Sequence, residues 1–132
     1  GLRDFEDRSF DFVVLNQTLP VIHKPLYMLK EMLRVGKRAV ISFVNFGYWR
    51  VRLKLLFGGR MPLTRALPYE WYDTPMIHPL TIRDFVYLCR QHEFSILQHA
   101  WFNDLESGRI YHSLPAPNLQ AAFAVFVITS PL

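Results

Sequence analysis

Residues 10–43 read FDFVVLNQTLPVIHKPLYMLKEMLRVGKRAVISF. Two short apolar runs, at residues 10–15 and 38–43, are bounded by polar turns, a pattern that is typical of buried strands. Between them Pro25 suits the first turn of a helix, and Leu26, Leu29 and Leu33 give that helix one apolar stripe. Gly36 is predicted to close the helix as a left-handed cap. Strand, helix and strand in this order predict a parallel βαβ unit, and hence an α/β protein.

The rest of the chain adds two helices and two strands to this unit. Residues 46–57 predict a helix that is apolar over most of its surface and ends at Gly58-Gly59, so it is either buried or in contact with a partner. Thr81 opens another helix, with Asp84 three residues later as in a capping box. Two more apolar runs, at 94–101 and 122–129, predict the last strands. No internal repeat or domain boundary interrupts the chain.

Length and composition indicate one globular domain of cytoplasmic type. The 132 residues are half apolar, which suffices for a real core. The one cysteine, Cys89, excludes an intrachain disulfide, and its place on the inner face of the predicted helix favours a core role over a nucleophilic one. No apolar run reaches the roughly 18–20 residues of a membrane helix, so no membrane partner is expected. The chain begins with Gly1 instead of Met, and we expect it to be a fragment of a longer protein.

The net charge of +4 is mild, but the basic residues are concentrated. Between Tyr48 and Arg65 there is no acid, and the basic residues there are Arg50, Arg52, Lys54, Arg60 and Arg65. Such a cluster can be a solvated helix face, or it can meet an acidic partner, an anionic membrane or nucleic acid. A basic protein-interaction or nucleic-acid-binding module is therefore one function that the sequence allows, with nucleic acid the less favoured partner.

The motifs of several enzyme classes are missing. The five histidines are scattered without metal-ligand spacing, so no metal site is expected. No G-x-S-x-G nucleophile motif is present. Neither G-x-G-x-x-G nor G-x-x-x-x-G-K-[ST] occurs, so the loops that cradle phosphates are absent. The chain is therefore not expected to work by itself as a nucleotide-cofactor enzyme.

Polar residues follow each of the first two predicted strands. Ligands of open parallel sheets bind beyond the carboxyl ends of the strands, which here are Asn16–Thr18 and Asn45–Tyr48. Asn45 offers a donor and an acceptor, and Gly47 allows a ligand to approach the backbone closely. The alternative is that these two residues serve only the geometry of a turn.

The run Pro68–Pro75 places Glu70 and Asp73 among aromatic residues. Apolar surroundings can raise a carboxyl pKa for proton transfer. The two acids can equally pair with Arg50, Arg52 or Arg65, and this structural pairing is the favoured interpretation. We then expect the run to be ordered and packed against the basic helix.

Several of these segments resemble the methionine biosynthesis protein MetW family. The segments are residues 9–19, 31–36, 45–52, 59–62, 67–75, 77–78 and 81–85. This family has the Rossmann-like fold of class I S-adenosylmethionine-dependent methyltransferases. The resemblance implies that residues 1–132 are a single partial domain, the C-terminal portion of that fold, without its N-terminal cofactor-binding half. Residues 10–15 would be its fourth strand and 38–43 its fifth, followed by an antiparallel last strand pair.

The same resemblance implies functions and sites. Asn16, Gln17 and Thr18 would form a wall of the S-adenosylmethionine pocket in the intact fold, although this chain alone is not expected to bind the cofactor. The chain would be an accessory protein of methionine biosynthesis that supports homoserine O-acyltransferase, its expected partner beside the missing N-terminal half. The alternative is a methyltransferase acting on a small molecule, with Tyr48, Glu70 and Tyr72 near the acceptor.

Overall fold

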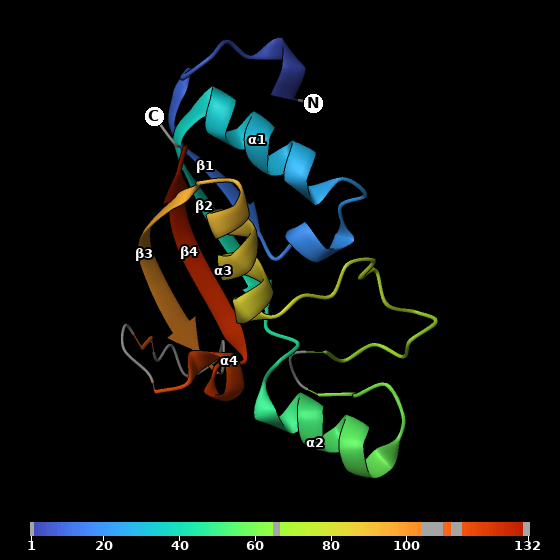
Figure 1. Ribbon diagram of the computed structural model, residues 1–132. Helices are drawn as coiled ribbons and strands as arrows, with labels where there is room; N and C mark the ends of the chain where they lie inside the picture. Colours follow the sequence, from blue (N-terminus) through green and yellow to red (C-terminus); the bar gives the residue numbers. More distant parts are fainter. Residues whose placement is uncertain (1, 65–66, 104–109, 112–114, 131–132) are drawn as a thin grey trace.

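The computed structural model describes residues 2–64, 67–103, 110–111 and 115–130 (Figure 1). The elements in chain order are η1 (Leu2–Asp4), β1 (Phe10–Asn16), η2 (Leu19–Val21), α1 (Pro25–Val35), β2 (Gly36–Val44), α2 (Trp49–Gly58), α3 (Ile82–Gln91), β3 (Ser95–Phe102), α4 (Pro117–Gln120) and β4 (Phe123–Thr129).

The strands form one mixed sheet in the order β1-β2-β4-β3. β1 and β2 are parallel, with Phe10 opposite Gly36 and Asn16 opposite Ser42, and α1 connects them. β4 is antiparallel to both of its neighbours, β2 and β3. The predicted βαβ unit and the antiparallel last strand pair are confirmed.

The main core lies between the sheet and two helices. Figure 1 shows α1 and α3 over the same face of the sheet. Alternate residues of β2 and β4 point into this layer, and Phe126 stacks on Phe85 of α3 with a centroid distance of 4.8 Å. Cys89 is buried in the same cluster, where burial raises the pKa of its thiol to about 11. A thiol in this setting is a core residue, as the sequence predicted.

The capping box of α3 is confirmed. The Asp84 amide donates to Thr81 Oγ1 at 3.1 Å, and the Thr81 amide donates to Asp84 Oδ2 at 3.1 Å. Two otherwise unpaired donors at the start of the helix are thereby satisfied.

The prediction of a left-handed cap at Gly36 is wrong. Gly36 has φ −111° and ψ 150°, and it begins β2 directly after the last turn of α1. A Cβ on Gly36 would lie 2.6 Å from Val13 Cγ2 in β1. Glycine suits this position because a Cβ would clash with the Val13 side chain.

β1 is an edge of the sheet within the described part of the chain, where its partner is β2. Val13 and Leu15 pack toward the core, whereas Phe12 and Val14, on the alternate face, are 53% and 64% exposed. Arg38 lies over the Phe12 ring at 6.0 Å from its centroid. An apolar strand thus borders solvent at the place where the resemblance implies a further strand.

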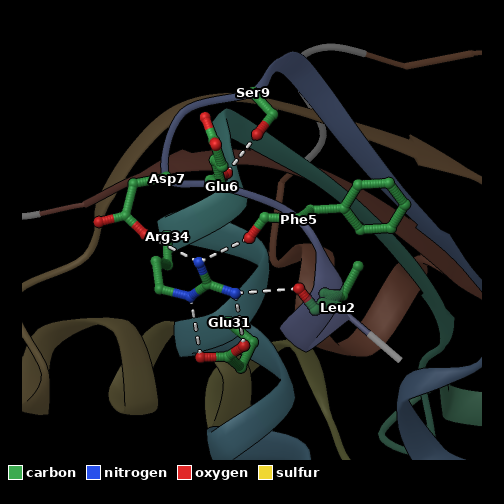
Figure 2. Close-up of polar contacts among 7 residues, drawn as sticks. All are labelled: Leu2, Phe5, Glu6, Asp7, Ser9, Glu31 and Arg34. Carbon is green, nitrogen blue, oxygen red and sulfur yellow. Dashed lines mark hydrogen bonds and ion pairs between the residues drawn. The ribbon is translucent and has the colours of Figure 1, made fainter.

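Arg34 of α1 fastens the N-terminal segment to the helix (Figure 2). Its guanidinium donates to the carbonyls of Leu2 and Phe5 at 2.9 and 3.0 Å. It also pairs with Asp7 at 2.7 Å and bidentately with Glu31 at 3.0 and 3.1 Å. The bonds that Arg34 donates lower the pKa of the Glu31 carboxyl.

We expect Arg34→Lys to loosen residues 2–8 and leave the rest of the fold intact. Lysine keeps the charge but cannot reproduce the planar fork that reaches two carbonyls and two carboxylates. Amide hydrogen exchange of residues 2–8 in the full-length protein should quicken by about tenfold, since charge-assisted bonds are lost. Arg90→Lys on the exposed surface of α3 is the control, and equal exchange in both variants would contradict this role of Arg34.

The same segment should respond to pH in a defined direction. Because the folded pKa of Glu31 is lowered, its contribution to stability is present above the ordinary glutamate pKa and is lost as the pH falls through the folded value. Protection of residues 2–8 should therefore decline on acidification in the wild type, and less so in the Arg34→Lys variant.

Candidate functional site

The residues beyond β1 are held by Ser42 of β2. The Ser42 hydroxyl donates to Asn16 Oδ1 at 2.7 Å and accepts from the Gln17 amide at 3.0 Å. The Gln17 amide also lies 2.8 Å from the Ser42 carbonyl, and Thr18 Oγ1 donates to the Asn16 carbonyl at 2.6 Å. The predicted wall of Asn16, Gln17 and Thr18 is thus brought together and fixed to the neighbouring strand.

Gln17 has an unusual backbone conformation within this wall. Its φ is 51°, a left-handed conformation that is uncommon for a residue with a Cβ, and its side chain is exposed. Backbone conformations of this kind gather at functional sites. The segment that follows is anchored from across the fold, because the amides of Ile77 and His78 donate to the Pro20 carbonyl at 2.8 and 2.7 Å.

Asn45 is a structural junction, which resolves the two interpretations of the turn beyond β2. Its buried side chain donates to the carbonyls of Asn118 and Ala121 at 3.0 and 2.7 Å, and it accepts from the amides of Gly47 and Ile82 at 3.0 and 3.1 Å. All four hydrogen-bonding positions of the amide are used within the chain, so none is left for a ligand.

Gly47 serves the same junction. A Cβ there would lie 2.9 Å from the Asn118 carbonyl oxygen. The close approach that the sequence suggested for a ligand is an approach of the chain to itself.

The three candidate acceptor-site residues lie in different surroundings. Tyr48 is half-buried against a second core cluster that contains Val51. Glu70 borders a small hollow that it shares with Arg60, and Tyr72 is exposed with its ring edge-on to Trp71. Within the described residues, no hydrogen bond or ring contact joins Tyr48, Glu70 and Tyr72.

The predicted pairing of Glu70 and Asp73 with the basic helix is not found for Arg50 or Arg52. Arg50 lies over the Trp49 ring at 5.2 Å, and Arg52 Nε donates to the Gly47 carbonyl at 2.7 Å. Local geometry explains the difference, because each arginine is satisfied beside its own position in the chain. Arg65, the third predicted partner, lies outside the described residues. The backbone carbonyl of Glu70 closes a turn by accepting from the amides of Asp73 and Thr74, both at 3.0 Å.

An aromatic cavity lies where the connection between α2 and α3 folds back on itself. Its volume is about 200 Å³. It is lined by Phe46, Met61, Pro62, Leu67, Tyr69, Trp71, Thr74, Met76 and Pro79. A space of this size suits one large side chain or a small apolar ligand.

α2 contributes little to either core. Of its residues only Val51 is buried, and Leu56 and Phe57 are 73% and 81% exposed. Figure 1 shows this helix lying away from the sheet. Of the two sequence-based alternatives for this apolar helix, burial is therefore wrong.

Neither a metal centre nor a spanning helix is found in the described ranges. No three His, Cys, Asp or Glu side chains gather there as ligands for a metal ion. None of the helices in those ranges has the length and apolar content to cross a bilayer.

The family model described as "Methionine biosynthesis protein MetW" matches residues 1–128. The chain belongs to the MetW family. A relative from Rhodopirellula baltica, named bifunctional methionine biosynthesis protein MetXA/MetW, is 36% identical over 126 residues. That match covers 95% of this chain and 20% of the relative, so the chain spans about a fifth of the relative's length.

The fold of this chain is methyltransferase-like. The chain is similar to a crystal structure from Thermotoga maritima, described as a SAM-dependent methyltransferase and possible histamine N-methyltransferase. The TM-score is 0.60 and the identity is 18%, and the similarity covers 96% of this chain and 58% of the other. The predicted fold class, a portion of a Rossmann-like methyltransferase fold, is confirmed.

Ser42 was not predicted as a site residue from the sequence. The available signal was its position in the parallel register, opposite Asn16. A lone polar residue in an apolar strand, opposite the polar end of its neighbour, indicates a hydrogen bond between the two.

Proposed function

We propose that this MetW-family chain is part of a cytoplasmic accessory protein of methionine biosynthesis, which binds homoserine O-acyltransferase and supports its reaction. One observation carries the proposal: in the Rhodopirellula relative the names MetXA and MetW are joined in one protein. MetX denotes homoserine O-acyltransferase, and two modules joined in one chain meet at high effective concentration.

The arrangement of the site supports an accessory role. The side-chain amide of Asn45 is fully hydrogen-bonded within the chain. Among the described residues, Tyr48, Glu70 and Tyr72 do not form a cluster. By contrast, a basic and apolar helix stands clear of the sheet. This combination suits contact with a protein better than chemistry on a small acceptor.

The test is O-acylation of homoserine by purified acyltransferase, with and without the full-length protein that contains this chain. We expect the full-length protein to raise the rate of acylation or to prolong the active life of the enzyme. Serum albumin at the same concentration controls for non-specific protection. Equal activity with both additions would contradict the proposal.

A methyltransferase acting on a small molecule is the second candidate. The likeness of fold and the exposed Gln17 beyond β1 favour it. S-adenosylmethionine would supply the methyl group in the complete fold, and the described residues offer it one polar wall, Asn16–Thr18. Methyl transfer by the full-length protein to a small acceptor would support this candidate, whereas residues 1–132 alone are not expected to bind the cofactor.

A further inference from the structure

The outer face of α2 has the geometry of a docking helix. At about 100° per residue, Leu53, Leu56 and Trp49 project roughly opposite Val51, the one residue of the helix that is buried. Phe57 lies next to them, since residues i and i+4 share a helix face. The helix is therefore attached along one side through Val51, and it presents an apolar stripe on the other.

Basic residues border this stripe on both sides. Arg50 and Lys54 project on one flank and Arg52 on the other. Glu31 and Glu70 are the nearest acids in the sequence before and after the helix. Within the described residues, the ion pairs of the chain involve Arg34 and Lys37, so no carboxylate neutralises the flanks of α2.

The segment after α2 extends the same surface. Gly59, with φ 63°, caps the helix, and Lys54 Nζ donates to the Leu63 carbonyl, which ties the returning chain to the helix. The exposed side chains of Met61 and Trp71 border the aromatic cavity of about 200 Å³. Aromatic residues, methionine and arginine are the types that are enriched in protein interfaces.

Isolated helices of this length are marginal in water, because nucleation is costly and few backbone bonds are made. α2 has ten residues and one buried side chain. A partner that covers the apolar stripe would stabilise the helix, and one with acidic residues around an apolar groove would complement its flanks.

We propose that the outer face of α2, centred on Leu53, Leu56 and Phe57, docks into an acid-rimmed apolar groove of homoserine O-acyltransferase. This inference rests on the proposed function and names the surface that performs it. Aliphatic leucines at the centre of the stripe suit a protein groove, and the joined MetXA/MetW relative supports a protein partner over nucleic acid or lipid.

The test compares the affinities of full-length variants for purified homoserine O-acyltransferase by calorimetry. L56A/F57A removes two side chains that are mostly exposed, so the fold should survive, as circular dichroism will verify. We expect its Kd to rise by at least about tenfold, as for the loss of central interface anchors. R50E/K54E should also weaken binding and reduce its salt dependence, with Arg52 left in place on the other flank.

Tyr87→Ala and Arg90→Glu on the exposed side of α3 are the matched controls, and they should bind like the wild type. Wild-type binding that L56A/F57A leaves unchanged would overturn this inference and leave the proposed function standing. Failure of the wild type to bind would remove both. Wild-type binding to phosphatidylserine vesicles or DNA that the α2 variants lose, with acyltransferase binding unaffected, would assign the surface to those partners and overturn the inference.

Discussion

Replacing Asn45 by alanine is expected to lower the free energy of unfolding of the full-length protein by about 3 kcal/mol or more. The side chain makes four hydrogen bonds: one is local, to Gly47, and the other three join the end of β2 to α3, to α4 and to Ala121 after it. Alanine would leave two carbonyls and two amides without these partners in a buried site, and each unpaired group costs free energy. Denaturation in urea, followed by circular dichroism, measures the change.

The matched control is Asn103→Ala. Asn103 is exposed, and its side chain accepts from the Ala122 amide at 3.0 Å, which is its one side-chain bond to the described part of the chain. Its loss should cost about 1 kcal/mol. Asn45→Asp should be worse than alanine, because it points a buried carboxylate at the carbonyls of Asn118 and Ala121. Equal free energies of unfolding for Asn45→Ala and Asn103→Ala would contradict the role of Asn45 as a structural junction.

Residues 1–132 produced alone are expected to self-associate at concentrations on the order of tens of micromolar. β1 is a sheet edge in the described structure, with open backbone groups and an exposed apolar face at Phe12 and Val14. Such an edge pairs readily with a second copy of itself. Light scattering on fresh samples would measure the association.

A charge on the edge should suppress this association. Val14→Lys places an ammonium group on β1, and Tyr87→Lys places one on α3 at nearly equal exposure, 64% against 63%. We expect the first variant to be largely monomeric and the second to associate like the wild type. A monomeric wild-type chain would show that the β1 edge does not drive self-association. Equal association of the two variants would show that the contact between copies lies elsewhere.

Local patterns in the sequence were enough to predict the parallel βαβ unit and α3, whereas the antiparallel pairing of the last two strands was implied by the family resemblance. The spacing of apolar residues identifies β1 and β2 as strands and α1 as a helix. The spacing of Thr81 and Asp84 marks the start of α3. Gly36 could not be assigned in this way. Its role depends on how closely Val13 of another strand approaches, which is a property of packing.

The site depended on contacts that no local pattern reveals. Asn45 bonds to residues 73 and 76 positions away, so its role could not be separated from that of a turn residue. The exposure of α2 could not be predicted either, because an apolar helix can be buried in its own core or covered by a partner, and the sequence pattern is the same in both cases. The position of Asn16–Thr18 at the end of β1 could be inferred from the strand pattern, because the carboxyl ends of parallel strands share one edge of the sheet. Their role as a wall of a cofactor pocket stays a prediction.

Binding of this MetW-family protein to homoserine O-acyltransferase, as proposed, can be measured in solution. Analytical ultracentrifugation of the two purified full-length proteins, alone and mixed, tests it most directly. We expect a new, faster-sedimenting species that contains both proteins, with a Kd of about 1 µM or tighter at physiological salt. Two boundaries that sediment in the mixture as they do alone, at concentrations of about 50 µM, would contradict it.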